Sequence, residues 1–401
     1  MVFSTAVSSE HAELSAARGR GVPVMSRGTM LAQLVRLYSG IAVAGAHGKT
    51  TTTSMIAFAL ERCGLDPTAA IGGRLSAFGS NARLGRGRHI VVEADESDGS
   101  FLELSPDIAV ITNLDDEHLE RYESFGALRE AFVQFGQRVP ASGCVVACLD
   151  DPHVRGLVPR LGRRTRTYGV DASDADVRAA DLALSPNSSS CAVECTGRAG
   201  SARARLTLAV PGRHNVQNAL AALAVGLELG LGLDRLAAVL GEFRGADRRF
   251  QVWGTVRGVT VVDDYGHHPT EIAAVLATAR LRAPRRLIVV FQPHRYTRTA
   301  RLLDAFGRVL AGADGVVLTE VYGAGEPPLP GATAEAVARA IRAVRDVPVE
   351  IVSSLGAAAA AAARLAGAGD LVVTLGAGSI GGVPSQILDA LGRPASTVHE
   401  G

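Results

Sequence analysis

An apolar run, a turn with two glycines and a threonine-rich segment follow one another near residue 45, and this order constrains the fold more than any other feature of the chain. The run Ile41–Ala44 predicts a buried strand of a parallel sheet, and Thr50–Leu60 predicts a helix that starts directly after the turn. Glycines in such a turn let backbone N–H groups close around phosphate, and the amino end of a helix adds positive potential. The segment therefore predicts an α/β sheet with a nucleotide triphosphate site at the strand end.

The only lysine of the chain, Lys49, lies in this turn, although the chain has 41 lysine and arginine residues in all. A compact ammonium fits between phosphate oxygens as a point charge, whereas a guanidinium is planar and of a different shape. The common phosphate loop has a further glycine where this chain has Val43, so the loop is a variant. A glycine-rich turn with an incidental lysine is the weaker interpretation. The residues expected to bind ATP here are Gly45, Ala46, His47, Gly48, Lys49, Thr50 and Thr51.

Composition limits the classes of function that the chain can serve. Its 401 residues suggest two or three domains, and 47% hydrophobic with 4% aromatic residues suits α/β layers that pack small side chains. A net charge of +1 gives no overall electrostatic attraction to nucleic acid. No apolar run reaches the length of a membrane span. The first residues lack the pattern of a signal peptide. Five cysteines in apolar surroundings are expected to be buried and reduced, which fits a cytoplasmic protein.

Strand and helix patterns alternate along two stretches of the chain, roughly 40–246 and 247–401. Such alternation predicts two mostly parallel sheets with covering helices, and places each site at the carboxyl ends of the strands. Residues 170–210 predict a small β excursion, and the first 40 residues are too few to bury a core of their own. The predicted strands are Ile41–Ala44, His89–Glu93, Ile108–Thr112, Cys144–Leu149, Val259–Val262, Leu287–Phe291, Gly315–Leu318, Val349–Val352 and Leu371–Leu375.

Acidic residues follow two of the predicted strands. Glu93 ends one apolar run and is the first candidate for a Mg²⁺ ligand together with Thr50, with Glu96 as the second. An acidic, solvated loop is the alternative. His118 follows the next strand, at the end of the segment TNLDDEH, and is a candidate for a metal ligand or a phosphate contact. A single histidine is more often structural, but this one is expected to lie beside the same site.

Two further groups of polar residues stand at element boundaries. His214, Asn215 and Asn218 open a predicted helix and can hydrogen-bond an adenine edge, although they could equally cap the helix. In the second α/β stretch the candidates are His267, Arg295 and Arg298, which follow adjacent strand ends. Arginine binds carboxylate and phosphate through two parallel hydrogen bonds, so this group predicts an anion site.

The set of motifs resembles the Mur ligase family. The segments that carry the resemblance are, in chain order, GAHGKTTTTSM, VVEADESDGSF, TNLDDEHLERY, PGRHNVQNALAAL, RRF, DDYGHHPTEI, FQPHRYTRT, EVYGAGE and GAGSI. The resemblance covers the whole chain and implies a partial N-terminal Rossmann-like domain (1–39), a central P-loop ATPase-like domain (40–246) and a C-terminal Rossmann-like ligase domain (247–401). Within the family, DDYGHHPTEI and FQPHRYTRT most resemble the branch that adds the first amino acid in peptidoglycan synthesis.

The resemblance implies that ATP phosphorylates the lactyl carboxylate of UDP-N-acetylmuramate and that the amine of L-alanine attacks the acyl phosphate. Lys49 would then hold the β- and γ-phosphates, Thr50 and Glu93 would bind Mg²⁺, and His118 would bind a second Mg²⁺. His214, Asn215 and Asn218 would lie toward the adenine. His267, Arg295 and Arg298 would position the substrate and the acyl phosphate, and the protein would be a monomer or a weak homodimer.

The single lysine also discriminates within the family, because later ligases of the pathway typically hold their second metal with a carbamylated lysine. Ala46 and Glu117 replace the threonine and aspartate that the family usually has. The family's glycine-rich UDP loop has no counterpart in residues 1–40, so we expect weak UDP-N-acetylmuramate binding by the chain as given. The alternatives are a paralogous amide ligase with another carboxylate and amino acid, or a non-catalytic nucleotide-binding protein.

Overall fold

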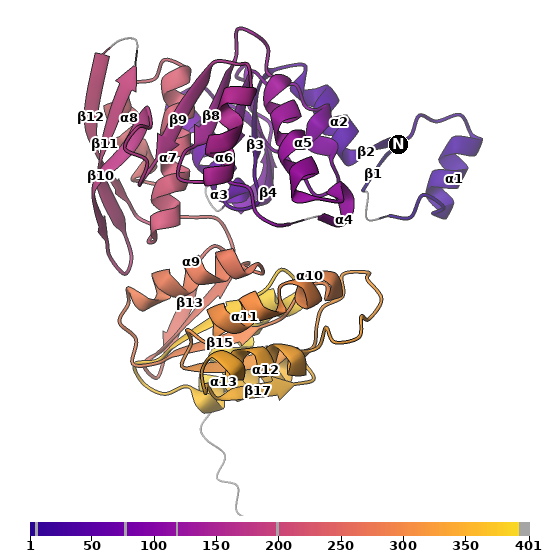
Figure 1. Cartoon of the computed structure of the whole chain (residues 1–401), viewed down its shortest axis with the longest axis vertical. Coiled ribbons are helices and arrows are strands. Elements are labelled where there is room, and N and C mark those ends of the chain that lie inside the picture. Colours follow the sequence, from indigo (N-terminus) through magenta and orange to yellow (C-terminus); the bar gives the residue numbers. More distant parts are fainter. Residues whose placement is uncertain (5–6, 76–77, 118, 198–199, 393–401) are drawn as a thin grey trace, which may run out of the picture. The chain divides into compact units, whose positions relative to one another are not determined.

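The computed structural model describes residues 1–4, 7–75, 78–117, 119–197 and 200–392 (Figure 1). These residues form two compact units. The first holds nearly all of residues 1–246, and the second holds residues 247 onward together with two short pieces, 184–186 and 211–213.

The first unit begins with a small parallel β-ribbon, formed by β1 (Val2–Phe3) and β2 (Met25–Ser26), with α1 (Ala12–Gly19) between the two strands. The run Val22–Val24, from which the sequence alone predicts a short strand, lies just before β2. Ser26 then caps α2 (Arg27–Val35), because its hydroxyl accepts the N–H of Thr29 at 3.0 Å. This short segment leads directly into the first strand of the central sheet.

The central sheet of the first unit has ten strands in the order β12-β11-β10-β9-β8-β7-β3-β6-β4-β5. The middle strands are parallel, whereas β5 and the β11–β12 hairpin run antiparallel to a neighbour. The strands are β3 (Ser39–Ala44), β4 (Thr68–Leu75), β5 (Ser80–Arg83), β6 (His89–Glu93), β7 (Ile108–Ile111), β8 (Cys144–Cys148), β9 (Thr165–Gly169), β10 (Val177–Leu184), β11 (Ser189–Gly197) and β12 (Gly200–Leu208).

Helices cover both faces of this sheet. Alternate residues of β3 point to opposite faces, so Ile41 and Val43 pack with one set of helices and Ala42 and Ala44 with the other. The first set is α3 (Lys49–Arg62), α7 (Arg213–Glu228) and α8 (Leu233–Leu240), and the second is α2, α5 (Phe125–Gln137) and α6 (Pro152–Leu157). The remaining helical segments are the short α4 (Leu119–Tyr122) and the 3-10 turns Ser100–Glu103 and Val158–Arg160. Burial on both sheet faces explains why β3 is a continuous apolar run.

The second unit has a six-stranded sheet in the order β13-β14-β18-β15-β16-β17, parallel except for the edge strand β13. Its strands are β13 (Gln251–Val256), β14 (Val259–Asp264), β15 (Leu287–Phe291), β16 (Gly315–Thr319), β17 (Val349–Val352) and β18 (Leu371–Leu375). One face packs on α9 (Pro269–Arg280), α11 (Leu303–Leu310) and α12 (Ala334–Val344), and the other on α13 (Leu355–Leu365) and α14 (Val383–Gly392). The helix α10 (Tyr296–Arg301) and a 3-10 turn at Ser379–Gly382 complete the unit.

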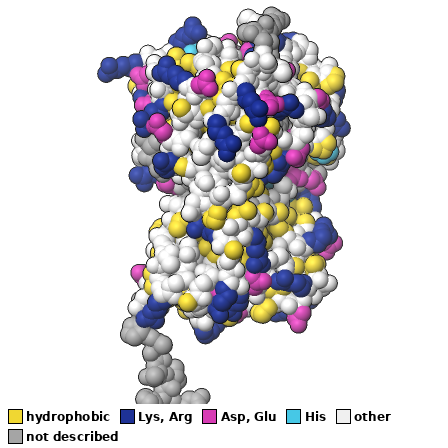
Figure 2. Space-filling model, turned by 90° about the vertical axis from the view of Figure 1, so that its left-hand side faces the viewer, with side chains coloured by type: hydrophobic (Ala, Val, Ile, Leu, Met, Phe, Trp, Pro, Cys, Tyr) yellow, Lys and Arg dark blue, Asp and Glu magenta, His cyan; other side chains and the backbone are white. Residues whose placement is uncertain are grey.

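The doubly wound α/β fold predicted from the alternation is confirmed in both units. The β excursion predicted for residues 170–210 is confirmed, and its strands β10, β11 and β12 extend the central sheet. All five cysteines are free and buried, as expected from their apolar surroundings. Arginine and acidic side chains are interspersed on the face that Figure 2 shows. Across the described ranges, no helix is both long and apolar enough to span a bilayer.

Candidate active site

The phosphate loop connects β3 to α3 through two glycines that adopt positive φ. Gly45 has φ 136° and Gly48 has φ 79°, and a Cβ at Gly45 would lie 2.1 Å from Oγ1 of Thr112. Only glycine combines such a backbone with so close a neighbour. Gly48 occupies the N-cap position of α3 and offers no side-chain cap. The first N–H groups of the helix therefore have no side-chain oxygen from the cap residue, which suits an anion at this end.

Lys49 is held by three oxygen atoms. Its ammonium donates to the carbonyl oxygens of Gly45 at 2.6 Å and Ala46 at 3.2 Å, and to Oε1 of Glu96 at 2.8 Å. Burial alone would lower the pKa of Lys49, but the carboxylate of Glu96 outweighs it and holds that pKa above its ordinary value. Burial also raises the pKa of Glu96 to about 7 despite the nearby ammonium. The lysine therefore stays charged, with the carboxylate of Glu96 as its partner.

Thr50 and Glu93 form a second pair at the start of α3. The hydroxyl of Thr50 donates to Oε1 of Glu93 at 3.1 Å, and Oε2 of Glu93 accepts the N–H of Gly72 at 2.9 Å. Adjacent ligands of an octahedral Mg²⁺ at 2.0–2.1 Å lie about 2.9 Å apart. A hydroxyl and a carboxylate oxygen at nearly this separation fit the donor set that Mg²⁺ prefers. The sequence offered two acidic residues as candidate Mg²⁺ ligands. Glu93 is the one that lies beside Thr50, whereas Glu96 pairs with Lys49.

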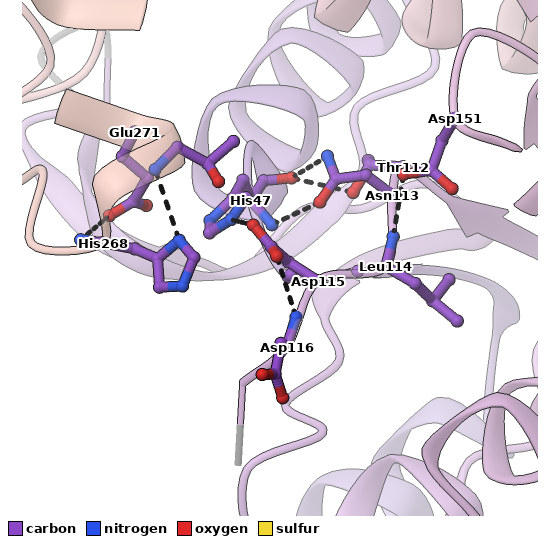
Figure 3. Close-up of polar contacts among 12 residues, drawn as sticks. His47, Thr112, Asn113, Leu114, Asp115, Asp116, Asp151, His268 and Glu271 are labelled. Carbon is purple, nitrogen blue, oxygen red and sulfur yellow. Dashed lines mark hydrogen bonds and ion pairs between the residues drawn. The ribbon is translucent and has the colours of Figure 1, made fainter. Parts of the chain in front are cut away.

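Residues that follow β7 fix the backbone of the loop (Figure 3). Asn113 accepts the N–H of His47 through Oδ1 at 2.7 Å and donates through Nδ2 to the carbonyl oxygen of His47 at 3.0 Å. The hydroxyl of Thr112 reaches the same carbonyl at 2.8 Å. Nε2 of His47 lies 2.8 Å from Oδ2 of Asp115. These contacts hold the peptide units of the loop in a single orientation before any ligand arrives.

His118, the predicted second metal ligand, lies outside the described residues, and its role stays a prediction. Next to it along the chain, Glu117 has only 5% of its surface exposed. Tyr122, at the end of α4, donates its hydroxyl to the carbonyl oxygen of Glu96 at 2.5 Å. The short helix after the TNLDDEH segment is thereby attached to the acidic loop that follows β6.

The residues predicted to meet adenine open α7. Asn215 and Asn218 are buried, and His214 is half-buried. Oδ1 of Asn218 accepts the hydroxyl of Thr52 at 3.1 Å and lies 2.7 Å from the position of a Cβ at Gly48. Asn218 therefore packs against the phosphate loop, and the contact with adenine that the sequence suggested for it stays a prediction. The adenine contacts predicted for His214 and Asn215 likewise stay predictions.

In the second unit, acidic and basic residues gather at the carboxyl end of β14. Oδ1 of Asp264 accepts the N–H of Gly266 and its Oδ2 accepts the N–H of Phe250, each at 2.7 Å. Burial nevertheless raises the pKa of Asp264 to about 6. Arg248 donates to Oδ2 of Asp263 at 2.8 Å, and its guanidinium lies 5.1 Å from the ring centre of Tyr265. The RRF segment is thus attached to the start of the DDYGHHP loop.

His267 and His294 form an aromatic group with two tyrosines. The ring of His267 lies 5.4 Å from that of Tyr265 and 5.6 Å from that of His294, which stacks on Tyr322 at 5.5 Å. Burial, with the positive charges of the neighbouring groups, lowers the pKa of His294 to about 3, so its imidazole is neutral at physiological pH. The backbone N–H of His267 donates to Oε2 of Glu271 at 3.0 Å. The backbone N–H of His268 donates to the same oxygen at 3.2 Å (Figure 3).

Of the two predicted arginines, Arg295 is the N-cap residue of α10 and Arg298 lies within that helix. Arg298 is buried, and its Nη1 lies 3.3 Å from Nδ1 of His294. Arg295 has φ 68°, ψ 135°, a backbone conformation that is unusual for a residue with a side chain. Its Nη1 lies 3.7 Å from Oε1 of Glu326. In the second unit, His294 therefore lies against both His267 and Arg298, so the three side chains form one group.

Sequence reasoning missed the residues that support these groups, above all His294, Tyr322 and Arg248. Each lies inside a motif that the sequence does show: FQPHRYTRT, EVYGAGE and RRF. A motif identifies the segment but does not tell which of its side chains turn inward. The parallel bridge between His294 and Tyr322, which lies outside the named strands, is what brings the two rings together.

Comparison with known proteins identifies the class to which this arrangement belongs. The chain matches the Mur ligase middle domain over residues 43–226 and the Mur ligase, glutamate ligase domain over residues 248–378. The two matches together span well over half of the chain. The chain therefore belongs to the Mur ligase family.

Individual relatives are similar over nearly the whole chain. UDP-N-acetylmuramate–L-alanine ligase of Burkholderia cenocepacia is 49% identical over 402 aligned positions, which cover 98% of this chain and 86% of the relative. The enzyme of the same name from Solibacter usitatus is 49% identical and is covered to 82%. The crystal structure of UDP-N-acetylmuramate–alanine ligase from Thermotoga maritima matches with a TM-score of 0.80 at 29% identity, covering 97% of this chain and 84% of that one.

Proposed function

We propose that this chain joins L-alanine to the lactyl carboxylate of UDP-N-acetylmuramate at the expense of ATP, a step in the synthesis of peptidoglycan precursors. The observation that carries the proposal is the 49% identity to UDP-N-acetylmuramate–L-alanine ligases over 98% of the chain. The site agrees with this chemistry, because a charged lysine in a glycine loop is combined with a hydroxyl–carboxylate pair suited to Mg²⁺.

The proposed reaction has two steps. A carboxylate oxygen of UDP-N-acetylmuramate attacks the γ-phosphorus of ATP, which forms an acyl phosphate and releases ADP. The amine of L-alanine then attacks the acyl carbon, loses a proton and expels inorganic phosphate, which leaves an amide. Both steps bring anionic groups together, so cationic groups that meet the developing charge supply most of the catalysis.

In the first unit, Lys49 would exchange its contact with Glu96 for the β- and γ-phosphates. The N–H groups at the start of α3, including those of Thr50 and Thr51, would face the phosphates. Thr50 and Glu93 would hold Mg²⁺, and His118 a second ion. When bound, Mg²⁺ neutralises phosphate charge during transfer. His214 and Asn215 would face the base, and Asn218 would support the loop from below.

In the second unit, Arg298 and Arg295 would bind the anionic groups of the substrate or of the acyl phosphate, since a guanidinium matches both carboxylate and phosphate. The neutral imidazole of His294, in contact with Arg298, can accept a hydrogen bond without adding charge. His267 would complete this group. We further propose that the protein acts in the cytoplasm and that it is a monomer or a weak homodimer.

The assignment is tested by measuring phosphate release from ATP in the presence of UDP-N-acetylmuramate and Mg²⁺, with L-alanine, L-serine or glycine as the second substrate. We expect release that depends on both substrates and is fastest with L-alanine, together with an amide product detected by mass spectrometry. Preference for another amino acid would favour the paralogous ligase. ATP binding without turnover, even with saturating substrates, would favour the non-catalytic nucleotide-binding protein.

A further inference from the structure

Arg248, close to the start of the second unit, has a strained backbone. Its φ is 59°, and that of Phe250 is 49°, values that residues with a side chain seldom adopt. The N–H of Arg248 donates to Oε1 of Gln251 at 2.9 Å, and its carbonyl oxygen accepts the N–H of Tyr265 at 2.8 Å. Such strain persists only where the surrounding structure fixes the residue, and it is concentrated at functional sites. The conformation therefore points to a task for Arg248 beyond closing a turn.

The guanidinium of Arg248 is held in one place by two strand ends. Its Nε donates to Oδ2 of Asp263 in β14 at 2.8 Å, and its Nη2 donates to the carbonyl oxygen of Gly376, directly after β18, at 2.7 Å. The side chain of Asp263 is completely buried, and β14 and β18 are neighbours in the sheet. A Cβ at Gly381 would lie 2.8 Å from Cζ of Arg248, so glycine leaves the room that the guanidinium fills. A planar fork held by two acceptors and packed closely against a backbone has little freedom to turn.

The ring of Tyr265 lies against this fixed cation. Its centre is 5.1 Å from the guanidinium of Arg248 and 5.3 Å from that of Arg249, distances at which a cation attracts the face of an aromatic ring. No hydrogen bond reaches the phenol oxygen of Tyr265 from the described residues, so contacts of the ring decide its orientation. The same ring meets that of His267 edge to face, with centres 5.4 Å apart and an angle of 83° between the planes. The orientation of His267 therefore depends on Tyr265, and that of Tyr265 on Arg248.

We propose that Arg248 is a positioning residue of the candidate active site, because its guanidinium orients the ring of Tyr265. Tyr265 in turn holds His267, which belongs to the group with His294 and Arg298 that we assign to substrate binding. Arg248 thereby acts through two rings rather than on the substrate itself. The inference rests on the proposed function for its kinetic consequences, whereas the orientation of the rings is measured without any substrate.

Two variants displace the guanidinium in different ways. Arg248→Lys keeps the charge, and its ammonium can still pair with the buried Asp263, but it has no planar fork to reach Gly376 and the ring of Tyr265 at the same time. Gly381→Ala keeps the arginine and puts a methyl group 2.8 Å from the present position of Cζ. Because the φ of Gly381 is not positive, alanine fits its backbone. In both variants the buried carboxylate keeps a cation beside it, so the fold is retained.

Arg280→Lys is the matched control. Arg280 also donates to one carboxylate and one carbonyl, which are Oδ2 of Asp314 and the oxygen of Gly312, each at 2.8 Å. It is the last residue of α9, whereas Tyr265 and His267 come before the first residue of that helix. The exchange therefore removes an equivalent fork without reaching the ring group.

The first measurement uses the full chain with ¹³C-labelled histidine and no substrate. The ring of Tyr265 lies close enough to contribute to the chemical shifts of the His267 ring protons. We expect the His267 signals to shift in both Arg248→Lys and Gly381→Ala and to stay in place in Arg280→Lys. The signals are assigned by their loss in His267→Gln. Unmoved His267 signals in the two variants would overturn the proposal.

The second measurement is steady-state phosphate release. We expect the KM of at least one of the two carboxylate substrates, L-alanine and UDP-N-acetylmuramate, to rise about tenfold in both variants, with the KM for ATP and all values of the control unchanged. A merely structural role of Arg248 would reduce the amount of active enzyme, which lowers kcat and leaves every KM as it was; that result would also overturn the proposal. If the unaltered chain releases no phosphate, the proposed function fails, and the shift of His267 still decides whether Arg248 positions the rings.

Discussion

The ammonium of Lys49 lies 2.8 Å from Oε1 of Glu96, and the side chain of Glu96 is buried and that of Lys49 largely so, with exposed fractions of 3% and 15%. Glu96 thereby takes the place that phosphate oxygens take in a loaded nucleotide site. When ATP binds, Lys49 must exchange the carboxylate of Glu96 for the phosphates. This ion pair therefore connects the stability of the nucleotide-free protein with its affinity for ATP.

Removing the carboxylate of Glu96 should destabilise the nucleotide-free protein and favour ATP. In Glu96→Gln the buried ammonium loses its counter-charge, which we expect to lower the free energy of unfolding by about 3 kcal/mol. The variant should bind ATP more tightly, because no carboxylate competes for Lys49. Denaturant unfolding with and without ATP measures both effects, and Glu103→Gln, an exposed position on the same segment, is the control. An unchanged unfolding midpoint without nucleotide would show that the ion pair contributes nothing.

Lys49→Arg keeps the charge but changes its shape. The planar guanidinium cannot sit as a point charge between phosphate oxygens, so we expect turnover to fall by about 10²-fold or more. Steady-state phosphate release measures this, and Arg86→Lys serves as the reverse exchange at an exposed position. Near-normal turnover in Lys49→Arg would contradict the proposed phosphate site.

Glu93→Gln should change the metal requirement rather than the fold. The amide keeps the size of the side chain and one oxygen but removes the negative charge that attracts Mg²⁺. We expect the Mg²⁺ concentration for half-maximal activity to rise about tenfold, with partial recovery at high Mg²⁺. If the Mg²⁺ dependence of Glu93→Gln matches that of the unaltered chain, Glu93 only supports Thr50 and Gly72.

His118→Ala addresses the ligand predicted from the sequence alone. A residue that holds a second metal should, when removed, make activity need more Mg²⁺ and lower the maximal rate. The comparison is a Mg²⁺ titration of phosphate release, with His153→Ala as a control histidine on α6. An unaltered titration curve for His118→Ala would make this histidine structural.

The sequence was sufficient for the parts of the fold that depend on apolar runs. The strands at His89–Glu93, Leu287–Phe291, Val349–Val352 and Leu371–Leu375 begin and end where predicted, because each run is bounded by polar or turn residues. The antiparallel edge strand β13 was missed, since Gln251–Val256 is largely exposed and has no continuous apolar pattern.

The residues of the candidate site also fall into those that local sequence could place and those that it could not. Lys49, Thr50 and Glu93 could be placed together from the sequence, because each stands next to a predicted strand or helix boundary, where the backbone fixes its direction. The partners of Asn218 and Glu96 could not be found from the sequence, because Thr52 and Lys49 are 166 and 47 residues away along the chain. Such pairings depend on how helix α7 and the loop after β6 fold onto α3, and no local pattern contains that information.

The stability of the second unit should depend on acid pH through Asp370. Its buried carboxylate accepts hydrogen bonds from Arg285 at 2.9 Å, Arg286 at 2.6 Å and the N–H of Gly367 at 2.8 Å. Burial opposes the charged form, but these donors outweigh it and lower the pKa of Asp370 to about 2. Because the folded pKa lies below the unfolded value of about 3.9, the stabilisation is complete above about pH 4 and is lost as the pH falls toward 2.

Asp370→Asn is therefore expected to cost about 1 kcal/mol at neutral pH, a reduced figure because both guanidiniums are open to solvent and screened. The difference between this variant and the unaltered chain should shrink as the pH falls from 4 to 2, since acid protonates Asp370 but leaves asparagine unchanged. Urea unfolding followed at several pH values measures it, with the exposed Asp346→Asn as the control. A difference that stays constant across this range would mean that the asparagine disturbs packing and that the charge of Asp370 is not what stabilises the fold.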